Sequence, residues 1–231
     1  MYYYLEQEDN DLSESGDNWI VEYLNVSLPA TENFHGTTIT TGICKVQVDG
    51  PLRLNKHGFE GDGVADLKHH GGEDKAVCVY SLKHYPYWES ALGIKLPSAA
   101  FGENLSVTLI TEEEVCIGDV FSLGTARLQV SQPRQPCKTL AARYGRNDLL
   151  KMVVDTGFTG FYFRVLQEGL AAPGQKLLLE DRSHPDISVA YANHVFHHDR
   201  KNKAALEKIL AVSALSASWQ VSFRELIDKP V

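Results

Sequence analysis

The spacing of apolar residues changes at Pro185, and this change limits most strongly what the chain can fold into. Before it, short runs with β-strand character are separated by Gly, Pro and Asp turns. Two of these runs, residues 43–48 and 127–131, alternate apolar and polar side chains, as a strand with one buried face does. We therefore expect a mixed, mainly β fold, a β-barrel with peripheral helices, whose strands cover residues 19–28, 38–48, 75–81, 115–123, 126–132, 160–167 and 175–180.

Helical patterns occur between some of these strands and dominate after Pro185. Pro86 is expected in the first turn of one helix, where its missing N–H costs nothing. Asn147 is expected to cap a second helix, over residues 148–154, which Gly157 would end. Three further helices are expected over residues 188–197, 202–212 and 216–226. The middle one carries an apolar stripe that must be buried, formed by Ala205, Leu206, Ile209, Leu210 and Val212.

These patterns predict three parts of the chain. Residues 1–35 form an acidic N-terminal segment, with the first strand or strands of the barrel from about residue 18. Residues 36–183 form the mainly β domain. Residues 186–231 form a C-terminal three-helix domain.

The charge distribution argues against nucleic-acid binding. The net charge is −8, and residues 1–44 carry eight acidic side chains and no Lys or Arg, while the rest is balanced. A protein that binds duplex nucleic acid normally shows a basic patch or a high pI. No signal peptide and no run of about 18 apolar residues occurs, so we expect a cytoplasmic protein without a membrane partner.

The four cysteines are widely spaced and form no CxxC pair, which favours a reducing compartment over disulfides or a zinc ribbon. Cys44, Cys78 and Cys116 lie in apolar strand patterns and are expected to pack as small core residues. Cys137 follows two prolines beyond a strand end, with Arg134 and Lys138 nearby. Cationic neighbours favour the thiolate, which binds metals or attacks electrophiles. The pattern alone leaves an incidental loop cysteine as an equal alternative.

Residues 68–75, Lys-His-His-Gly-Gly-Glu-Asp-Lys, form the most unusual loop. Adjacent glycines let backbone N–H groups approach a ligand, and lysine supplies countercharge, so the loop could hold an anion. A β-turn with solvated charges explains the same residues. Residues 101–105 and 156–160 are two further polar loops.

A rival metal site consists of His194, His197 and His198, which share one face of a helix. Three imidazoles could hold zinc. However, no carboxylate stands in a zincin-like position, and the polar end of a helix explains these histidines. His84 and His184 are assigned no function, and no P-loop, Rossmann, GxSxG or paired-carboxylate pattern is present.

Several motifs together resemble MOSC-domain proteins. They are Gly-Phe-Glu-Gly-Asp at 58–62, His-His-Gly-Gly at 69–72, Phe-Gly-Glu-Asn-Leu at 101–105, Ile-Gly-Asp at 117–119 and Ser-Gln-Pro-Arg-Gln-Pro-Cys at 131–137. The last run is the specific one. The resemblance covers residues 40–180, and the helical remainder resembles the three-helix domain of the YiiM-like group. Residues 36–183 would then be the MOSC domain.

The resemblance implies a β-barrel-like fold that binds a molybdenum pterin cofactor, with Cys137 as the ligand to the metal. A thiolate suits a metal that is also held by the two sulfurs of a pterin dithiolene. The pterin and its phosphate need further donors. The candidates are Lys68, His70, Gly71, Gly72, Asn104, Ser131 and Arg134.

The reductases of this family convert N-hydroxylated purines, amidoximes and hydroxylamines to the amine or amidine plus water. The resemblance therefore implies a small N-hydroxylated substrate and an electron-donor redox protein as partners. His69 or His70 is the candidate proton donor, because imidazole titrates near neutral pH. Two alternatives stay open: a non-catalytic carrier of the cofactor or of sulfur that uses Cys137, and a cysteine-nucleophile enzyme without a metal.

Overall fold

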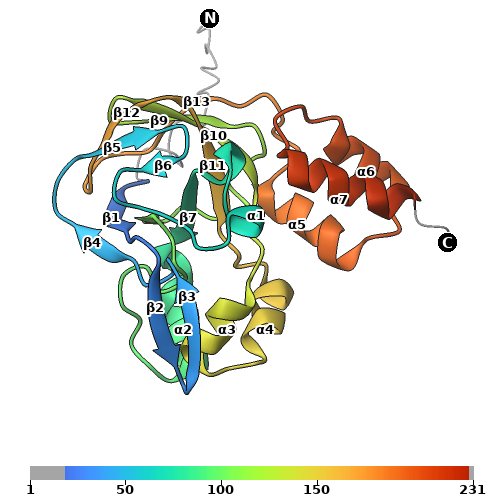
Figure 1. Cartoon of the computed structure of the whole chain (residues 1–231). Coiled ribbons are helices and arrows are strands. Elements are labelled where there is room, and N and C mark those ends of the chain that lie inside the picture. Colours follow the sequence, from blue (N-terminus) through green and yellow to red (C-terminus); the bar gives the residue numbers. More distant parts are fainter. Residues whose placement is uncertain (1–18, 229–231) are drawn as a thin grey trace, which may run out of the picture.

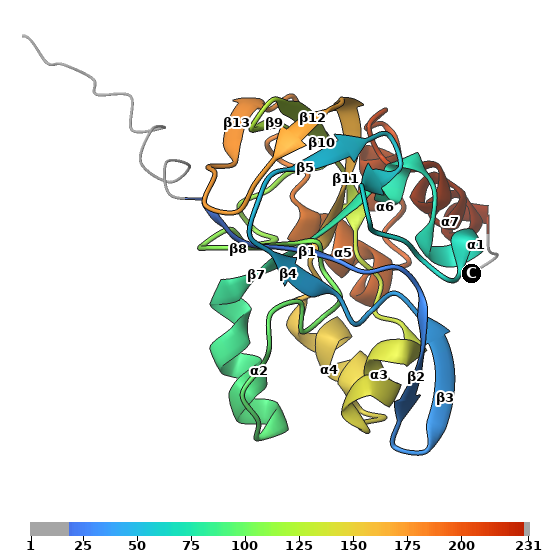
Figure 2. The ribbon, with the colours of Figure 1, turned by 60° about the vertical axis from the view of Figure 1, so that its left-hand side comes forward.

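One curled sheet of eight strands organises the protein, which we describe from a computed structural model covering residues 19–228 (Figures 1 and 2). Neighbouring strands run antiparallel except for the parallel pair β7 and β8. In spatial order the strands are β13 (Leu178–Asp181), β9 (Val120–Leu123), β10 (Ala126–Pro133), β11 (Phe161–Gln167), β7 (Val77–Ser81), β8 (Leu105–Val107), β1 (Val21–Val26) and β4 (Val46–Val48).

Two smaller sheets complete the β-structure. Strands β5 (Leu52–Asn55), β6 (Gly58–Phe59) and β12 (Gly169–Ala171) form one of them. Strands β2 (Ala30–Phe34) and β3 (Thr37–Thr41) form a hairpin that extends toward helices α3 (Lys138–Tyr144) and α4 (Leu149–Thr156) in both views. His35 and Gly36 at its tip both have positive φ angles, as a type I′ turn requires.

The helices within the mainly β part form two groups. The short α1 (Leu67–His70) and the 3₁₀ turn η1 (Glu73–Lys75) precede β7, which η2 (Leu82–His84) and α2 (Tyr85–Leu92) follow. Helices α3 (Lys138–Tyr144) and α4 (Leu149–Thr156) connect β10 to β11 and lie near α2 and the hairpin (Figure 2). The position of Pro86 in the first turn of α2 and the end of α4 at Gly157 confirm the predictions.

Asn147 does not cap α4, and this prediction is wrong. Asp148 holds the cap position, with φ −78° and ψ −14°. The side chain of Arg146 donates two hydrogen bonds to the Asp148 carboxylate, at 2.8 and 2.7 Å. These bonds link the two side chains in the turn before the helix, which begins at Leu149, one residue later than expected.

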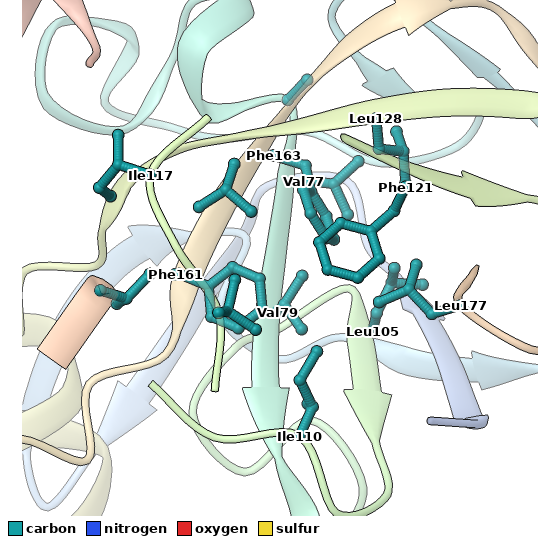
Figure 3. Close-up of a cluster of buried hydrophobic side chains, with 14 of the residues drawn as sticks. Val77, Val79, Leu105, Ile110, Ile117, Phe121, Leu128, Phe161, Phe163 and Leu177 are labelled. Atoms are coloured by element: carbon teal, nitrogen blue, oxygen red, sulfur yellow. The ribbon is translucent and has the colours of Figure 1, made fainter. Parts of the chain in front are cut away.

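Helices α5 (Val189–His198), α6 (Lys203–Leu210) and α7 (Ala217–Asp228) pack against one another beside the sheet (Figure 1). The predicted stripe of α6 is buried at Ala205, Leu206 and Ile209. These side chains belong to the same hydrophobic cluster as those of the large sheet. Figure 3 shows the part of this cluster where Val77, Phe121 and other side chains of the sheet meet. The mixed, mainly β fold with C-terminal helices is therefore confirmed.

The strand expected over residues 38–48 is broken near Gly42. A Cβ atom on Gly42 would lie 2.2 Å from the carbonyl oxygen of Gly63, so the chain passes its neighbour too closely for a regular strand. Cys44 consequently lies outside a strand and is half-buried, contrary to prediction. Val46 in β4 is 63% exposed, so the expected buried face is also wrong here.

Residues 115–119 form a turn instead of the start of a strand. The Asp119 carboxylate accepts a hydrogen bond from the backbone N–H of Cys116 at 2.8 Å, and Gly118 has a φ of +95°. Cys116 is buried as expected but takes part only in an isolated bridge with Ser188. Cys78, in β7, fits the prediction in full. Among residues 19–228, no helix is long and apolar enough to cross a membrane.

Candidate functional site

A cavity of about 410 Å³ collects most of the predicted site residues. It lies among the start of β7, the end of β10, the α1–η1 segment and the loops at residues 40–45 and 101–104. Segments far apart in the sequence therefore meet here. The predicted residues that line this cavity are His70, Gly71, Gly72, Asn104, Arg134 and Cys137.

Cys137 is the residue immediately before α3, in extended conformation after the two prolines. Burial raises the pKa of its thiol, but a hydrogen bond with the side chain of His70, the charge of Arg134 and the N–H of Leu140 together outweigh burial. The net result is a pKa of about 6. Cys137 is therefore mainly a thiolate at neutral pH, the form that binds metals.

Arg134 places a buried positive charge in the cavity wall, with the residue only 5% exposed. Its Nη2 donates to the carbonyl oxygen of Phe101 at 2.7 Å, and its backbone N–H donates to that of Gly160 at 2.9 Å. Its Nη1 is buried and has no hydrogen-bond partner among the described residues. Buried polar atoms are almost always paired, so this nitrogen fits an acceptor atom of a bound ligand.

The glycine pair leaves the cavity open at the end of α1. Asp66 caps the helix by accepting the N–H of His69 at 3.1 Å. A Cβ on Gly71 would approach the Leu67 carbonyl oxygen to 2.7 Å, so the chain needs glycine there. Gly72 has a φ of +98° with nothing within 4 Å of its Cβ position. A ligand can therefore reach the backbone at Gly72.

Asn104 has a structural role in the cavity wall. Its Nδ2 donates to Asp62 Oδ2 at 2.8 Å and to the carbonyl oxygen of Asn25 at 3.2 Å, and its Oδ1 accepts the N–H of Cys78 at 3.0 Å. Both amide hydrogens therefore already have protein partners. Asn104 holds β7, β1 and Asp62 together and leaves no free donor for a ligand.

Comparison with known proteins identifies the family. The MOSC domain matches residues 66–178, and the YiiM-like 3-alpha helix domain matches residues 187–229. The protein YflK of Bacillus subtilis (strain 168) is 51% identical over 213 residues, 92% of this chain and 96% of that protein. The chain belongs to the YiiM-like group of MOSC-domain proteins.

The comparison of structures agrees with this identification. YiiM from Geobacillus stearothermophilus superposes with a TM-score of 0.77 at 41% identity, covering 90% of this chain and 99% of that one. A protein of Gibberella moniliformis named "Reductase" is 39% identical over 158 residues, which are 67% of this chain but only 28% of that protein. The matched stretch is thus a small part of a much longer fungal protein.

Three predicted site residues do not line the cavity of this MOSC domain. Lys68 and His69 are exposed, and the His69 ring lies 2.7 Å from Asp66 Oδ2. Ser131 is buried in β10, where its hydroxyl is within 2.5 Å of the carbonyl oxygen of Asp74 and 3.1 Å of that of Tyr162. Contact of these residues with a cofactor stays a prediction. The geometry favours His70, Gly71, Gly72, Arg134 and Cys137, because the amide hydrogens of Asn104 already have protein partners.

A buried ion pair in the same wall was not predicted from the sequence. Lys45 and Asp62 bind each other, and their side chains are 4% and 10% exposed. Asp62 ends the Gly-Phe-Glu-Gly-Asp motif, which was a usable signal, whereas Lys45 lay within an expected strand. Lys75 also lines the cavity, and its Nζ donates to the carbonyl oxygen of His69 at 2.7 Å. Burial lowers the pKa of Lys75.

The histidines of α5 form no comparable centre. His194 and His198 are exposed, with ring centroids 5.6 Å apart. His197 is half-buried, with its ring centroid 6.2 Å from that of His198, and its Nε2 is buried without a hydrogen-bond partner among the described residues. Within residues 19–228, no group of three or more His, Cys, Asp or Glu side chains is arranged to hold a metal ion.

Proposed function

We propose that this protein is a molybdenum-cofactor enzyme that reduces N-hydroxylated compounds, with Cys137 as the protein ligand to the metal. The observation that supports this proposal most directly is the Cys137 thiolate in the wall of a cavity of about 410 Å³, next to the buried guanidinium of Arg134. A thiolate matches a metal that also has dithiolene sulfur ligands. Membership of the MOSC family supports the same cofactor.

The residues present suit the cofactor's other groups. The unpartnered Nη1 of Arg134 can donate to an anionic oxygen, and Lys75 adds a further positive charge to the wall, where Lys45 is paired with Asp62. The accessible backbone at Gly72 leaves room for a planar or anionic group. We assign binding of the cofactor to Cys137, Arg134, Lys75 and the Gly71–Gly72 backbone.

When bound, the molybdenum centre would supply the two electrons that, with two protons, convert an N–OH group to N–H and water. The chain's part is to orient the substrate, restrict water and deliver protons. His70 lines the cavity and hydrogen-bonds to Cys137, so it is the better proton donor of the two candidates. His69 faces Asp66 instead. The electrons must come from a separate redox protein.

Two further observations support parts of this proposal. The fungal relative that matches 158 residues of this chain is named a reductase, which favours catalysis over storage of cofactor or sulfur. All four cysteines are free thiols, in agreement with a reducing cytoplasmic setting. A carrier would use the same thiolate, so turnover is the decisive property.

The test compares two thiols in one cavity. The full chain, made in a host that synthesises the cofactor, is assayed for bound molybdenum and for reduction of an N-hydroxylated purine by an artificial reductant. Cys137→Ser should lose both, and the matched control Cys78→Ser should keep activity per folded molecule. Bound molybdenum without turnover in the wild type would favour the carrier, and full activity in Cys137→Ser would refute the ligand assignment.

A further inference from the structure

A second cavity, of about 520 Å³, lies away from Cys137, where α5 meets the mainly β part of the chain. Its wall comes from four segments, residues 83–87, 111–113, 154–158 and 190–198, and shares no residue with the wall of the first cavity. Its volume is in the range of small-molecule sites. Nothing in the proposed reaction uses it.

The inner wall of this second cavity contains a buried acid–base pair. His84 Nε2 lies 2.7 Å from Glu112 Oε2, and the two side chains are 6% and 5% exposed. The other oxygen, Glu112 Oε1, accepts the backbone N–H of Gly160 at 2.6 Å. Both oxygens of this carboxylate therefore have protein partners, so the pair shapes the wall without needing a ligand.

Asn193, in contrast, lacks a partner. This residue of α5 lies in the wall, is 3% exposed, and its Oδ1 has no hydrogen-bond partner among the described residues. An unpaired buried carbonyl oxygen costs about 1 to 3 kcal/mol. A ligand that donates an N–H to Asn193 would remove this cost. A primary amide also carries both a donor and an acceptor, so its best complement is a ligand edge with both.

Aromatic rings form the side of the cavity next to the His84–Glu112 pair. Phe158 stacks on the His84 ring, with centroids 3.9 Å apart and planes at 11°. Tyr87 meets Phe158 edge to face at 5.5 Å and 88°. Such a wall favours a flat, unsaturated ligand.

The charges in the wall have both signs. Lys83 contributes a positive charge, and Glu112, Glu113 and Asp155 contribute negative ones. Glu112 hydrogen-bonds with His84, and Asp155 is paired to Lys151 outside the wall. Lys83 and Glu113, which have opposite signs, remain, so the cavity offers no one-sided field that would select a strongly charged ligand.

We propose that the second cavity is a binding site for a small, uncharged aromatic or heteroaromatic molecule with a carboxamide-like edge, which Asn193 recognises. The inference does not depend on molybdenum chemistry. It predicts the ligand's class from the unpaired amide, the aromatic side and the balanced charge of the wall.

The occupant would touch the residues that brace Arg134 in the first cavity. Glu112 holds the N–H of Gly160, whose carbonyl oxygen accepts the N–H of Arg134. On the other side, Tyr80 donates to the carbonyl oxygen of Phe158 at 2.9 Å. Its ring stacks on that of Phe101 at 4.1 Å, and the Phe101 carbonyl oxygen binds Arg134 Nη2. Binding should therefore be visible in the backbone resonances of Gly160 and Arg134.

The experiment uses benzamide as the probe and the full chain without cofactor. Isothermal titration and ¹⁵N-resolved NMR should show saturable binding, with shift changes at residues 190–198 and 154–160. Asn193→Leu keeps the volume but removes the amide, and should weaken binding by about 5- to 10-fold. Benzoate, which replaces the amide by a carboxylate, should bind more weakly than benzamide.

Cys137→Ser is the matched control, because it alters the first cavity only and should leave benzamide binding unchanged. The proposal is overturned if benzamide does not saturate the wild type, if shift changes map to the first cavity, or if Asn193→Leu binds as well as the wild type. The NMR map is obtained on the wild type, so it decides the question even if the variant folds poorly. None of these outcomes depends on whether the protein is a reductase.

Discussion

Cys137 and Cys78 line the same cavity, yet their surroundings shift the pKa values of the two thiols in opposite directions. Complete burial raises the pKa of Cys78 to about 11. Burial also acts against ionisation of Cys137, but the hydrogen bonds from His70 and Leu140 and the charge of Arg134 lower its pKa to about 6. Arg134 favours both thiolates, so the hydrogen bonds at Cys137 distinguish the two sites.

The rate of alkylation by iodoacetamide should reflect this difference in the cofactor-free protein. A lowered pKa means that the thiolate persists down to about pH 6, so the Cys137 rate should be half-maximal near that pH. Peptide mass spectrometry after timed labelling gives the rate for each cysteine. In Cys137→Ser the fast reaction should vanish, and in Cys78→Ser it should stay. A midpoint near the ordinary value of 9.0 would contradict the geometry.

Replacing Arg134 tests its charge separately from its shape. Arg134→Gln removes the positive charge, so the alkylation midpoint of Cys137 should move to higher pH, and the bound molybdenum of the cofactor-loaded protein should fall. Arg134→Lys keeps the charge but not the planar donor, so its alkylation midpoint should rise less than that of Arg134→Gln. Equal midpoints in both variants would show that the charge of Arg134 does not act on Cys137. Thermal unfolding checks that each variant is folded.

Local signals in the sequence were sufficient to select Cys137 and Arg134 as candidate site residues and to predict the C-terminal helices. The prolines and Arg134 lie within a few residues of Cys137, and the stripe of α6 has helical period, so both could be predicted. The Lys45–Asp62 pair and the His84–Glu112 pair join residues 17 and 28 positions apart across different elements. No local pattern encodes such a contact, because it depends on how the sheet curls.

Close backbone approaches were equally invisible in the sequence. The strand pattern around Gly42 is regular, but the carbonyl oxygen of Gly63 occupies the space that a regular neighbour would need. His69 and His70 are adjacent in the sequence, yet one faces Asp66 and the other Cys137. The direction of each ring is fixed by α1, a four-residue helix that was expected to be a loop.

Glu112 should tolerate an isosteric amide better than an apolar side chain. Glu112→Gln keeps a carbonyl oxygen for the Gly160 N–H, so the loss of unfolding free energy should be about 1 kcal/mol. Glu112→Leu leaves His84 and the Gly160 N–H buried without this partner and should cost about 3 kcal/mol or more. Urea denaturation measures both. Faster hydrogen exchange of the Gly160 amide in Glu112→Leu than in Glu112→Gln would show that the destabilisation arises at this hydrogen bond. Equal stability of the two variants would refute the prediction.

His197 should make the protein less stable in mild acid. Burial, followed by the charges of Arg200 and His198, lowers its pKa to about 4, compared with an ordinary value of 6.5. Below pH 6.5 the unfolded chain therefore gains a proton that the folded chain refuses, so folded stability should fall as the pH drops from 6.5 toward 4. His197→Gln cannot titrate and should show a smaller stability difference between pH 7 and pH 5 in urea unfolding. The matched control is His194→Gln on the exposed face of α5, which should keep the wild-type difference. If His197→Gln loses as much stability as the wild type over this range, another group causes the acid sensitivity.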